Sequence, residues 1–185
     1  MKIAIGVTGA SGAIYARLLI EELGRYQDQI EECGIVFSDS AKIVWQTELG
    51  EFCPDSFPFK IYDTKDFGAG FASGSAGYDC MIVCPCSMGT LGRIAGGVSD
   101  NLMTRSADVM LKERKRLILV TRETPLSLIH IRNMQSVTDA GAIVLPASPS
   151  FYSHPQSIEE LCLTVVHRAL QIAGISTDSF RWGSK

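Results

Sequence analysis

Hydroxyl, glycine and arginine residues follow the apolar segments of this chain, at positions where proteins commonly bind phosphate. These residues are Gly9, Ala10, Ser11 and Gly12 after the first segment, Ser38 after the second, Ser87, Met88, Gly89 and Thr90 after a central one, Arg122 and Glu123 after the next, and Tyr152 in the loop after the last. Backbone N–H groups at a helix N-terminus, hydroxyls and a guanidinium all bind phosphate oxygens. Tight turns explain any one of these clusters, but their recurrence favours a phosphorylated ligand.

The glycine spacing limits which phosphorylated ligand this is. Gly6, Gly9 and Gly12 form GxxGxxG, whereas dinucleotide-binding turns carry GxGxxG, so a nicotinamide cofactor is disfavoured. None of the five tyrosines has a lysine four residues later, as a short-chain dehydrogenase would need. Asp39 could still bind a ribose, so NAD binding stays a minor alternative. The phosphate-loop ending Gly-Lys-Ser/Thr is absent, which argues against an ATPase.

The Cys84-Pro85-Cys86 segment could be a metal-binding or redox pair. Its CxC spacing is weak evidence, because no second Cys/His pair lies at zinc-site spacing and Cys84 ends a predicted buried strand. We therefore favour packing of small side chains at this strand end and expect no metal. His130, His154 and His167 are scattered and form no recognisable histidine-based triad.

Two cations in helical segments are candidate anion ligands. Lys112 begins the charged run 112–116, which is typical of a solvated helix end, although Lys112 could reach an anion of a neighbouring chain. Arg168 falls within the apolar stripe of the last predicted helix, where Ser157 and Glu160 form a capping box. A buried cation needs a partner, so Arg168 would meet an anionic ligand, a carboxylate or another subunit. Snorkelling of its guanidinium to solvent is an equal alternative.

Alternating strands and helices must position these residues. Apolar runs predict strands at 2–8, 33–38, 59–62, 79–84, 116–121 and 142–145, and helices from 13 onward and at 39–48, 87–95, 101–112, 124–140 and 157–173. Pro85 is expected to end its strand, and Thr124 to cap the helix that has Pro125 in its first turn. Strands without polar alternation predict a doubly wound parallel α/β sheet, a Rossmann- or flavodoxin-like three-layer sandwich. Ligands of such sheets bind outside the carboxyl ends of the strands.

Length and composition are those of one globular domain. We expect a single domain over 1–185 with a C-terminal tail at 174–185. Hydrophobic residues make up 46% and charged residues 20%, which excludes a disordered or fibrous protein, and the net charge of −3 argues against a nucleic-acid partner. Glycines interrupt the N-terminal apolar residues and no apolar run approaches the roughly 18 residues of a membrane span, so we expect neither a signal peptide nor a membrane. The six cysteines then suit a reducing cytoplasm.

Three long segments resemble the UbiX-type flavin prenyltransferases. The segments are VTGASGAIYARLL at 7–19, VCPCSMGTLGRIAGGVSDNLMTRSADVMLKERKRLILVTRETP at 83–125 and GAIVLPASPSFYSHPQSIEEL at 141–161. The chain departs from this family's pattern in two places: Asp39 stands where relatives commonly carry lysine, and residues 50–77 show little match. The first departure weakens any cationic contact to a flavin from position 39. The second, at 50–77, is expected to affect packing between subunits more than chemistry.

The resemblance implies roles for individual residues. FMN would be held by Gly9, Ala10, Ser11, Ser38, Ser87, Met88, Gly89, Thr90 and Arg122. The phosphate of dimethylallyl phosphate would be bound by Tyr152 and Arg168, with Lys112 contributed by a neighbouring subunit. Ser11, Glu48 and Glu123 would be catalytic, with Ser11 near the flavin N5 and the two glutamates as acid/base or charge-stabilising groups. Trp182 would close over the site.

The reaction implied is transfer of a dimethylallyl group to N5 of reduced FMN, followed by ring closure onto C6, without a metal. The product, prenylated FMN, would serve a UbiD-type decarboxylase of the ubiquinone-pathway or aromatic-acid type, and the family assembles as a homododecamer. One alternative is a non-catalytic carrier of FMN for such a decarboxylase, which would not need Glu123, Tyr152 and Arg168 together. A cysteine-type decarboxylase of related fold is disfavoured, because the segment 85–90 lacks asparagine and no histidine precedes His130.

Overall fold

The computed structural model describes residues 1–180 and 183, and in this part of the chain six parallel strands form one sheet. The strands are β1 (Lys2–Val7), β2 (Glu32–Phe37), β3 (Lys60–Tyr62), β4 (Cys80–Cys86), β5 (Arg116–Thr121) and β6 (Ile143–Pro146). Their order across the sheet is β3-β2-β1-β4-β5-β6. From β1 the chain adds strands first on one side, to β3, and then on the other side, from β4 to β6. The point between β1 and β4, where this order reverses, is where open α/β sheets bind ligands.

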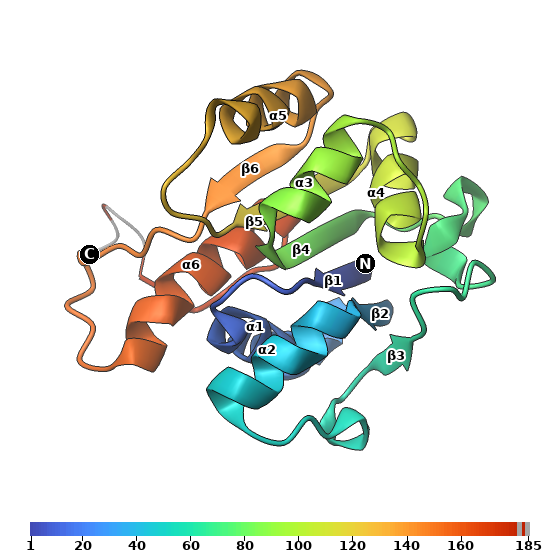
Figure 1. Ribbon diagram of the computed structural model, residues 1–185. Helices are drawn as coiled ribbons and strands as arrows, with labels where there is room; N and C mark the ends of the chain where they lie inside the picture. The colour runs from blue at the N-terminus through green and yellow to red at the C-terminus, as the bar shows by residue number, and fades with distance from the viewer. Residues whose placement is uncertain (181–182, 184–185) are drawn as a thin grey trace.

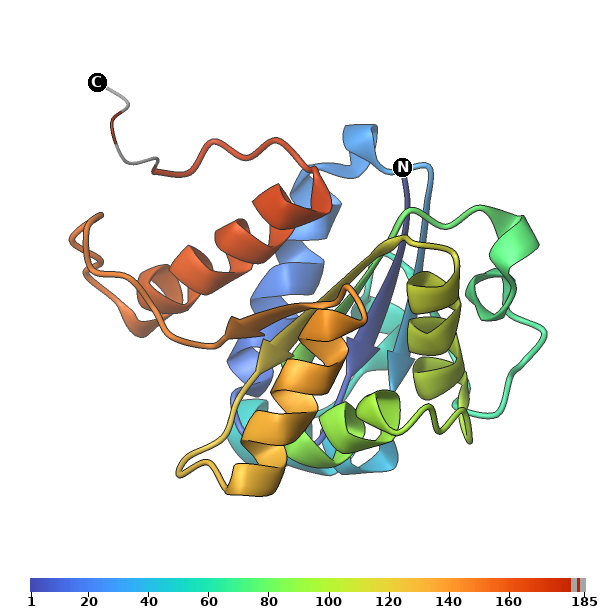
Figure 2. The same cartoon turned by 90° about the horizontal axis from the view of Figure 1, so that it is seen from above.

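Helices cover both faces of the sheet (Figures 1 and 2). They are α1 (Ala13–Arg25), α2 (Asp39–Leu49), α3 (Met88–Ala95), α4 (Leu102–Lys112), α5 (Leu128–Asp139) and α6 (Ile158–Ala173), with short 3-10 turns η1 (Gln27–Gln29), η2 (Pro54–Ser56), η3 (Gly70–Ala72) and η4 (Gly74–Ala76). One apolar core joins α1, α2 and α6 to the sheet, and a second joins α3, α4 and α5. The predicted doubly wound, three-layer α/β fold is therefore confirmed.

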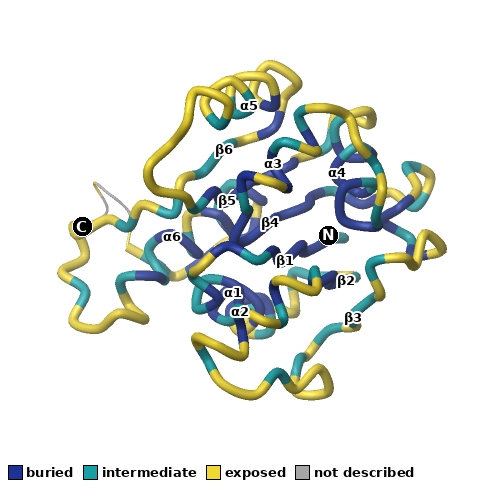
Figure 3. Tube along the Cα trace, in the orientation of Figure 1, coloured by how far each residue is buried: buried dark blue, intermediate teal, exposed yellow. Residues whose placement is uncertain are grey.

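Burial follows from the apolar content of the strands. All seven residues of β4 are buried, and each of β1, β2 and β5 buries five of its six residues, so these strands contact helices on both faces. The edge strand β6 is only partly covered, and α5 above it is exposed along most of its length (Figure 3). Within the described residues, no helix is long and apolar enough to cross a membrane.

Several predicted boundaries are wrong for identifiable reasons. Pro85 does not end its strand, because β4 continues to Cys86 across an irregularity in its pairing with β5. Thr124 does not cap α5, which begins after Ser127, whose hydroxyl accepts from the N–H of His130. Helix α2 is capped by Ser38, which accepts from the N–H of Ala41. These hydroxyl caps satisfy N–H groups that have no partner within the helix.

Candidate functional site

Thr8 joins the two turns at the point where the sheet order reverses. Its hydroxyl donates to the carbonyl oxygen of Pro85 at 2.7 Å and accepts from the N–H of Ser87 at 2.8 Å. The turn after β1 and the turn after β4 are therefore held side by side by one buried side chain. Sequence reasoning missed this role, since a threonine at a strand end carries no distinctive signal.

The turn 8–12 packs closely against the start of α2. A Cβ added to Gly9 would lie 2.3 Å from the Cβ of Ser40, so only glycine allows this approach. Gly12 has φ 106°, a left-handed conformation that also favours glycine. Ser38 caps α2 at the same place. The structure thus brings Gly9 and Ser38, two predicted flavin ligands, to one edge of the sheet.

Glu48 lies at the N-terminus of α1. Its carboxylate accepts from the N–H of Gly12 at 2.9 Å and from the N–H of Ala13 at 2.7 Å. Partial burial would raise the pKa of Glu48, but hydrogen bonds from the Ser11 side chain, Ala13 and Gly12, with the positive charge of Arg122, lower it below its ordinary value. Ser11 and Glu48, predicted as catalytic residues, are therefore in contact, and Glu48 is held ionised.

The N-terminus of α3 provides the second turn. Ser87 caps the helix, accepting from the N–H of Thr90 at 3.3 Å, and its hydroxyl lies 3.2 Å from that of Thr90. Met88 and Gly89 form the first turn of α3 between them. The predicted segment 87–90 is thus a helix N-terminus at the carboxyl edge of the sheet, a position suited to an anion.

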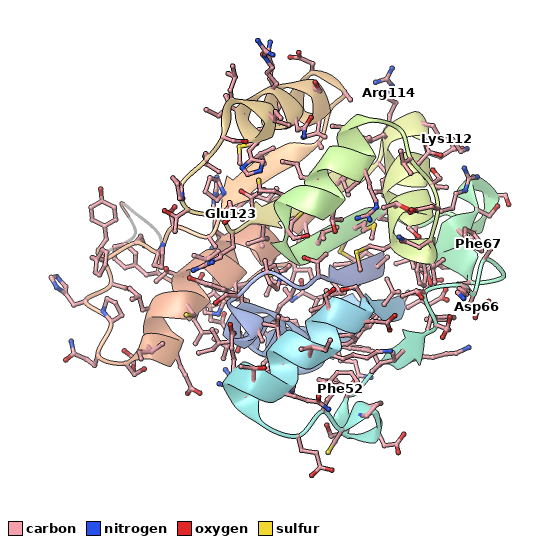
Figure 4. The ribbon with its side chains drawn as sticks, in the orientation of Figure 1. Phe52, Asp66, Phe67, Lys112, Arg114 and Glu123 are labelled. Atoms are coloured by element: carbon pink, nitrogen blue, oxygen red, sulfur yellow. The ribbon has the colours of Figure 1, made fainter. Side chains whose placement is uncertain are left out.

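Arg122 and Glu123 follow β5 and line a small cavity. The N–H of Arg122 donates to the carbonyl oxygen of Cys86 at 3.3 Å, which places Arg122 beside the turn after β4. The cavity, of about 280 Å³, is also lined by Ala147 and Ser148 from the segment after β6. Glu123 is exposed at this edge of the sheet (Figure 4), and one carboxylate oxygen accepts from the N–H of Thr124 at 3.1 Å.

A larger groove of about 1030 Å³ adjoins this cavity. It lies between α6, the loop after β6 and the segment 174–180, and it shares Ser148 with the small cavity. Tyr152 and Arg168, the predicted phosphate ligands, both line it. Arg168 is exposed, whereas the buried face of α6 is formed by neighbours such as Val165 and Ala169. The expectation that Arg168 lies within the apolar stripe is therefore wrong, and its guanidinium is accessible from the groove.

Lys112 lies far from these residues in its own chain. It ends α4 just before β5 begins, so it is at the amino edge of the sheet, and Figure 4 shows it well apart from Glu123, which follows β5. Its ammonium group pairs with the carboxylate of Glu113. The structure does not bring Lys112 to Tyr152 and Arg168 within one chain.

Tyr15 is a site residue that sequence reasoning missed. Its ring covers Gly12, where an added Cβ would come within 2.9 Å of the ring carbon Cδ2. Burial, followed by interactions with Cys162, raises the pKa of Tyr15 to about 12, so its hydroxyl stays protonated. A role in the site could not be inferred from one tyrosine in a helical pattern, and only the fold shows that its ring closes one side of the turn.

Cys84 and Cys86 are free, buried side chains that pack at a strand end, which is the interpretation that we favoured over a metal or redox pair. Cys84 and Cys86 are buried at the end of β4, and burial raises the pKa of both thiols. Over the described residues, no cluster of three or more histidine, cysteine, aspartate or glutamate side chains could hold a metal. Trp182, predicted to close over the site, lies outside the described residues.

Comparison with known proteins places this chain in one family. The family model described as Flavoprotein matches residues 1–170. The flavin prenyltransferase UbiX of Thermoplasma acidophilum is 42% identical over 185 residues, covering 98% of this chain and 100% of that protein. The crystal structure of AnUbiX (PadA1) in complex with FMN and dimethylallyl pyrophosphate is 41% identical, with a TM-score of 0.89 over 100% of this chain and 98% of that one. A dodecameric FMN-dependent UbiX-like decarboxylase from Escherichia coli O157:H7 is 38% identical, with a TM-score of 0.92 over 100% of both chains.

The doubly wound sheet, with its glycine and serine turns at the reversal point, and the family match define the chain as a flavoprotein. Within that class, the identity of about two-fifths over the full chain shows that it belongs to the UbiX family of flavin prenyltransferases. It is a prenyl-transferring enzyme, as the resemblance of its sequence motifs implied.

Proposed function

We propose that this enzyme transfers a dimethylallyl group from dimethylallyl phosphate to N5 of reduced FMN and promotes ring closure onto C6. The observation that carries the proposal is the meeting of two sites at one edge of the sheet. The turns 8–12 and 87–90 with Arg122 form one site, and the groove with Tyr152 and Arg168 adjoins it through shared wall residues. An acceptor and a donor bound there would be neighbours, as group transfer requires.

The proposed FMN-binding residues are Gly9, Ala10, Ser11, Ser38, Ser87, Met88, Gly89, Thr90 and Arg122. Their chemistry fits a flavin phosphate and ring, because two helix N-termini, hydroxyls and a guanidinium lie beside the turn 8–12, where Gly9 allows close packing against α2. The flavin would supply the nucleophilic atoms and an apolar π-face beside the allylic group. The protein would hold this face away from water and fix its distance from the donor.

The proposed donor-binding residues are Tyr152 and Arg168, with Lys112 from a neighbouring subunit. A departing phosphate gains negative charge, which a guanidinium, an ammonium and a phenol hydroxyl stabilise. The related AnUbiX structure was obtained with the pyrophosphate. Because the groove of this chain offers one arginine and one tyrosine from its own residues, we propose the monophosphate as its donor.

The carboxylates of Glu48 and Glu123 would have separate roles in the reaction. Glu48 is fixed by hydrogen bonds at the N-terminus of α1 and would act as an ionised, charge-stabilising group together with Ser11. Glu123 lines the small cavity beside Arg122 and would assist proton removal during ring closure, a step that the released phosphate could also serve.

We further propose a homo-oligomer, a dodecamer like the related Escherichia coli structure, built from a single FMN-binding domain with its C-terminal tail. Exposed apolar side chains on and before α5 support association, since Leu126, Leu128, Ile129 and Ile131 are 45–68% exposed. A UbiD-type decarboxylase would receive the product. The buried free cysteines suit a reducing compartment, and we propose the cytoplasm.

Anaerobic incubation with reduced FMN and dimethylallyl phosphate tests the proposal. Mass spectrometry should find flavin heavier by one dimethylallyl unit, and Arg168→Ala should abolish this product while FMN stays bound. Unchanged flavin retained by folded wild-type protein would contradict prenyl transfer from this donor. Replacing the monophosphate with the pyrophosphate in a parallel reaction would then separate a wrong donor from a carrier function.

A further inference from the structure

Helices α1 and α6 lie side by side and are joined by polar contacts along their seam (Figures 1 and 2). Arg17 pairs with Glu159, and Glu22 contacts His167. The two helices carry different parts of the proposed site. Helix α1 begins at the turn 8–12, and α6 carries Arg168. Their relative placement therefore sets the distance between the flavin site and the donor site.

Glu22 is the buried member of this seam. Its side chain is 4% exposed, and each carboxylate oxygen has a partner: Oε1 accepts from Arg25 at 2.6 Å, and Oε2 lies 2.9 Å from Nε2 of His167. A carboxylate can only accept, so Nε2 of His167 carries the proton. Arg25 is 72% exposed and can move, whereas His167 is held between the helices. The contact with His167 thus fixes how α6 sits against α1.

His167 directly precedes Arg168, and both line the groove. A small rotation of α6 about its axis would therefore displace the guanidinium of Arg168 along the groove wall. A buried polar pair resists such rotation, because any other arrangement leaves a carboxylate without its hydrogen bond. Apolar contacts between the same helices have no comparable directional preference.

We propose that Glu22 and His167 are positioning residues that hold Arg168 at the distance from the flavin turn that prenyl transfer needs. The inference rests on the proposed function of Arg168 as a donor-phosphate ligand. Glu22 does not line the groove, and His167, which does, acts in this role through its contact with Glu22. Their removal should weaken donor binding and turnover while leaving the FMN site intact.

Three variants test this: Glu22→Leu, His167→Leu and the double variant. Each single variant should raise the KM for dimethylallyl phosphate about tenfold or more, because displacement by about 1 Å can cost a hundredfold in rate. The Kd for FMN should stay within about twofold of wild type. His167→Gln keeps an N–H donor for Glu22 and should recover much of the wild-type KM. The control is Glu31→Gln, which removes an exposed carboxylate that lies outside the seam.

The double variant separates positioning from plain stabilisation. Replacing both partners with apolar side chains should restore much of the thermal stability that a single change removes, since no polar group is then left unpaired. The donor KM should nevertheless stay raised in this variant. A double variant with wild-type KM, or single variants whose KM and kcat match Glu31→Gln, would overturn the inference. Absence of turnover in the wild type would instead refute the proposed function, so the two failures are distinguishable.

Discussion

At the scale of single residues, Glu48 shows how the site combines local structure with charge. It comes from the last turn of α2, yet its carboxylate binds the first N–H groups of α1. A negative charge at a helix N-terminus is stabilised by the helix dipole and by those N–H groups. The same contacts lower the pKa of Glu48, so its role in folding and its charge in the site have one physical cause.

Replacing Glu48 with Gln should make stability less sensitive to acid. The pKa of Glu48 in the folded protein lies below its usual value near 4.5, so ionised Glu48 stabilises the fold above that pH. This contribution disappears as the pH falls through the lowered pKa. Calorimetry should therefore show a steeper loss of Tm for the wild type than for Glu48→Gln between about pH 6 and pH 3. Parallel curves for the two proteins would contradict this, and exposed Glu51→Gln is the control.

Individual site residues were predicted unevenly. The strand-end pattern predicted Ser38, the segment 87–90 and Arg122, because strand ends can be located from apolar runs. Glu48 came only from the family resemblance, since a glutamate on an exposed helix face has no distinguishing pattern. Thr8 and Tyr15 were missed altogether because their contacts join segments far apart in the chain. The roles proposed for these residues in catalysis and binding remain predictions.

At the scale of elements, the close approach of the turn 8–12 to α2 defines the flavin site. A Cβ on Gly9 would lie 2.3 Å from the Cβ of Ser40 and 3.1 Å from its backbone carbonyl carbon. Neither atom belongs to a flexible side-chain end that could swing away. The turn and the helix must separate if residue 9 carries a side chain.

The Gly9→Ala variant should therefore lose FMN affinity by about tenfold or more, as 1.4 kcal/mol of misfit already costs tenfold. Flavin fluorescence titration measures the loss. Gly24→Ala is the matched control, since its Cβ would make an ordinary 3.4 Å contact with Pro58 and alanine favours the helix by about 1 kcal/mol. This control should bind FMN normally and unfold at a slightly higher temperature. Equal FMN affinity in both variants would show that the close approach is unimportant.

Most elements were predictable, and the errors have local causes. The strand 116–121 was predicted to the residue because charged residues flank its apolar run. Helix α5 begins later than predicted because Ser127 and His130 satisfy each other's N–H groups, with Nδ1 of His130 accepting from Ser127. This reciprocal cap normally uses Glu or Gln at the third position, so the histidine concealed it. Pro85 stays within β4 because the pairing with β5 shifts there, where a missing N–H is tolerated.

At the scale of the whole molecule, the position of Lys112 indicates that the proposed oligomer would complete the donor site. Lys112 ends α4 at the amino edge of the sheet and does not line the groove that holds Tyr152 and Arg168. If Lys112 contributes to catalysis, it must do so in the groove of another subunit. The exposed apolar face of α5 supports association of this kind (Figure 3).

Mixing two impaired variants tests whether neighbouring subunits share one site. Lys112→Ala should lower turnover by removing a donor ligand, and Arg168→Ala should abolish it. Oligomers reassembled from equal amounts of both should regain about a quarter of the wild-type activity, because that share of grooves combines an intact Arg168 with an intact Lys112 from a neighbour. Activity no higher than the average of the separate variants would show that Lys112 does not act across subunits. Reassembly can be followed by light scattering.

The Glu48 carboxylate at the start of α1 also determines the orientation that a bound flavin would take. A helix N-terminus that already holds the negative Glu48 repels a second anion. The N-terminus of α2 has the acidic Asp39 in its first turn, whereas that of α3 is capped by the uncharged hydroxyl of Ser87, has no acidic residue in its first turn and can accept an anion. The flavin phosphate is therefore expected to point toward α3, with the ring lying toward α1 and the groove. One glutamate would thus orient the acceptor along the sheet edge without binding it.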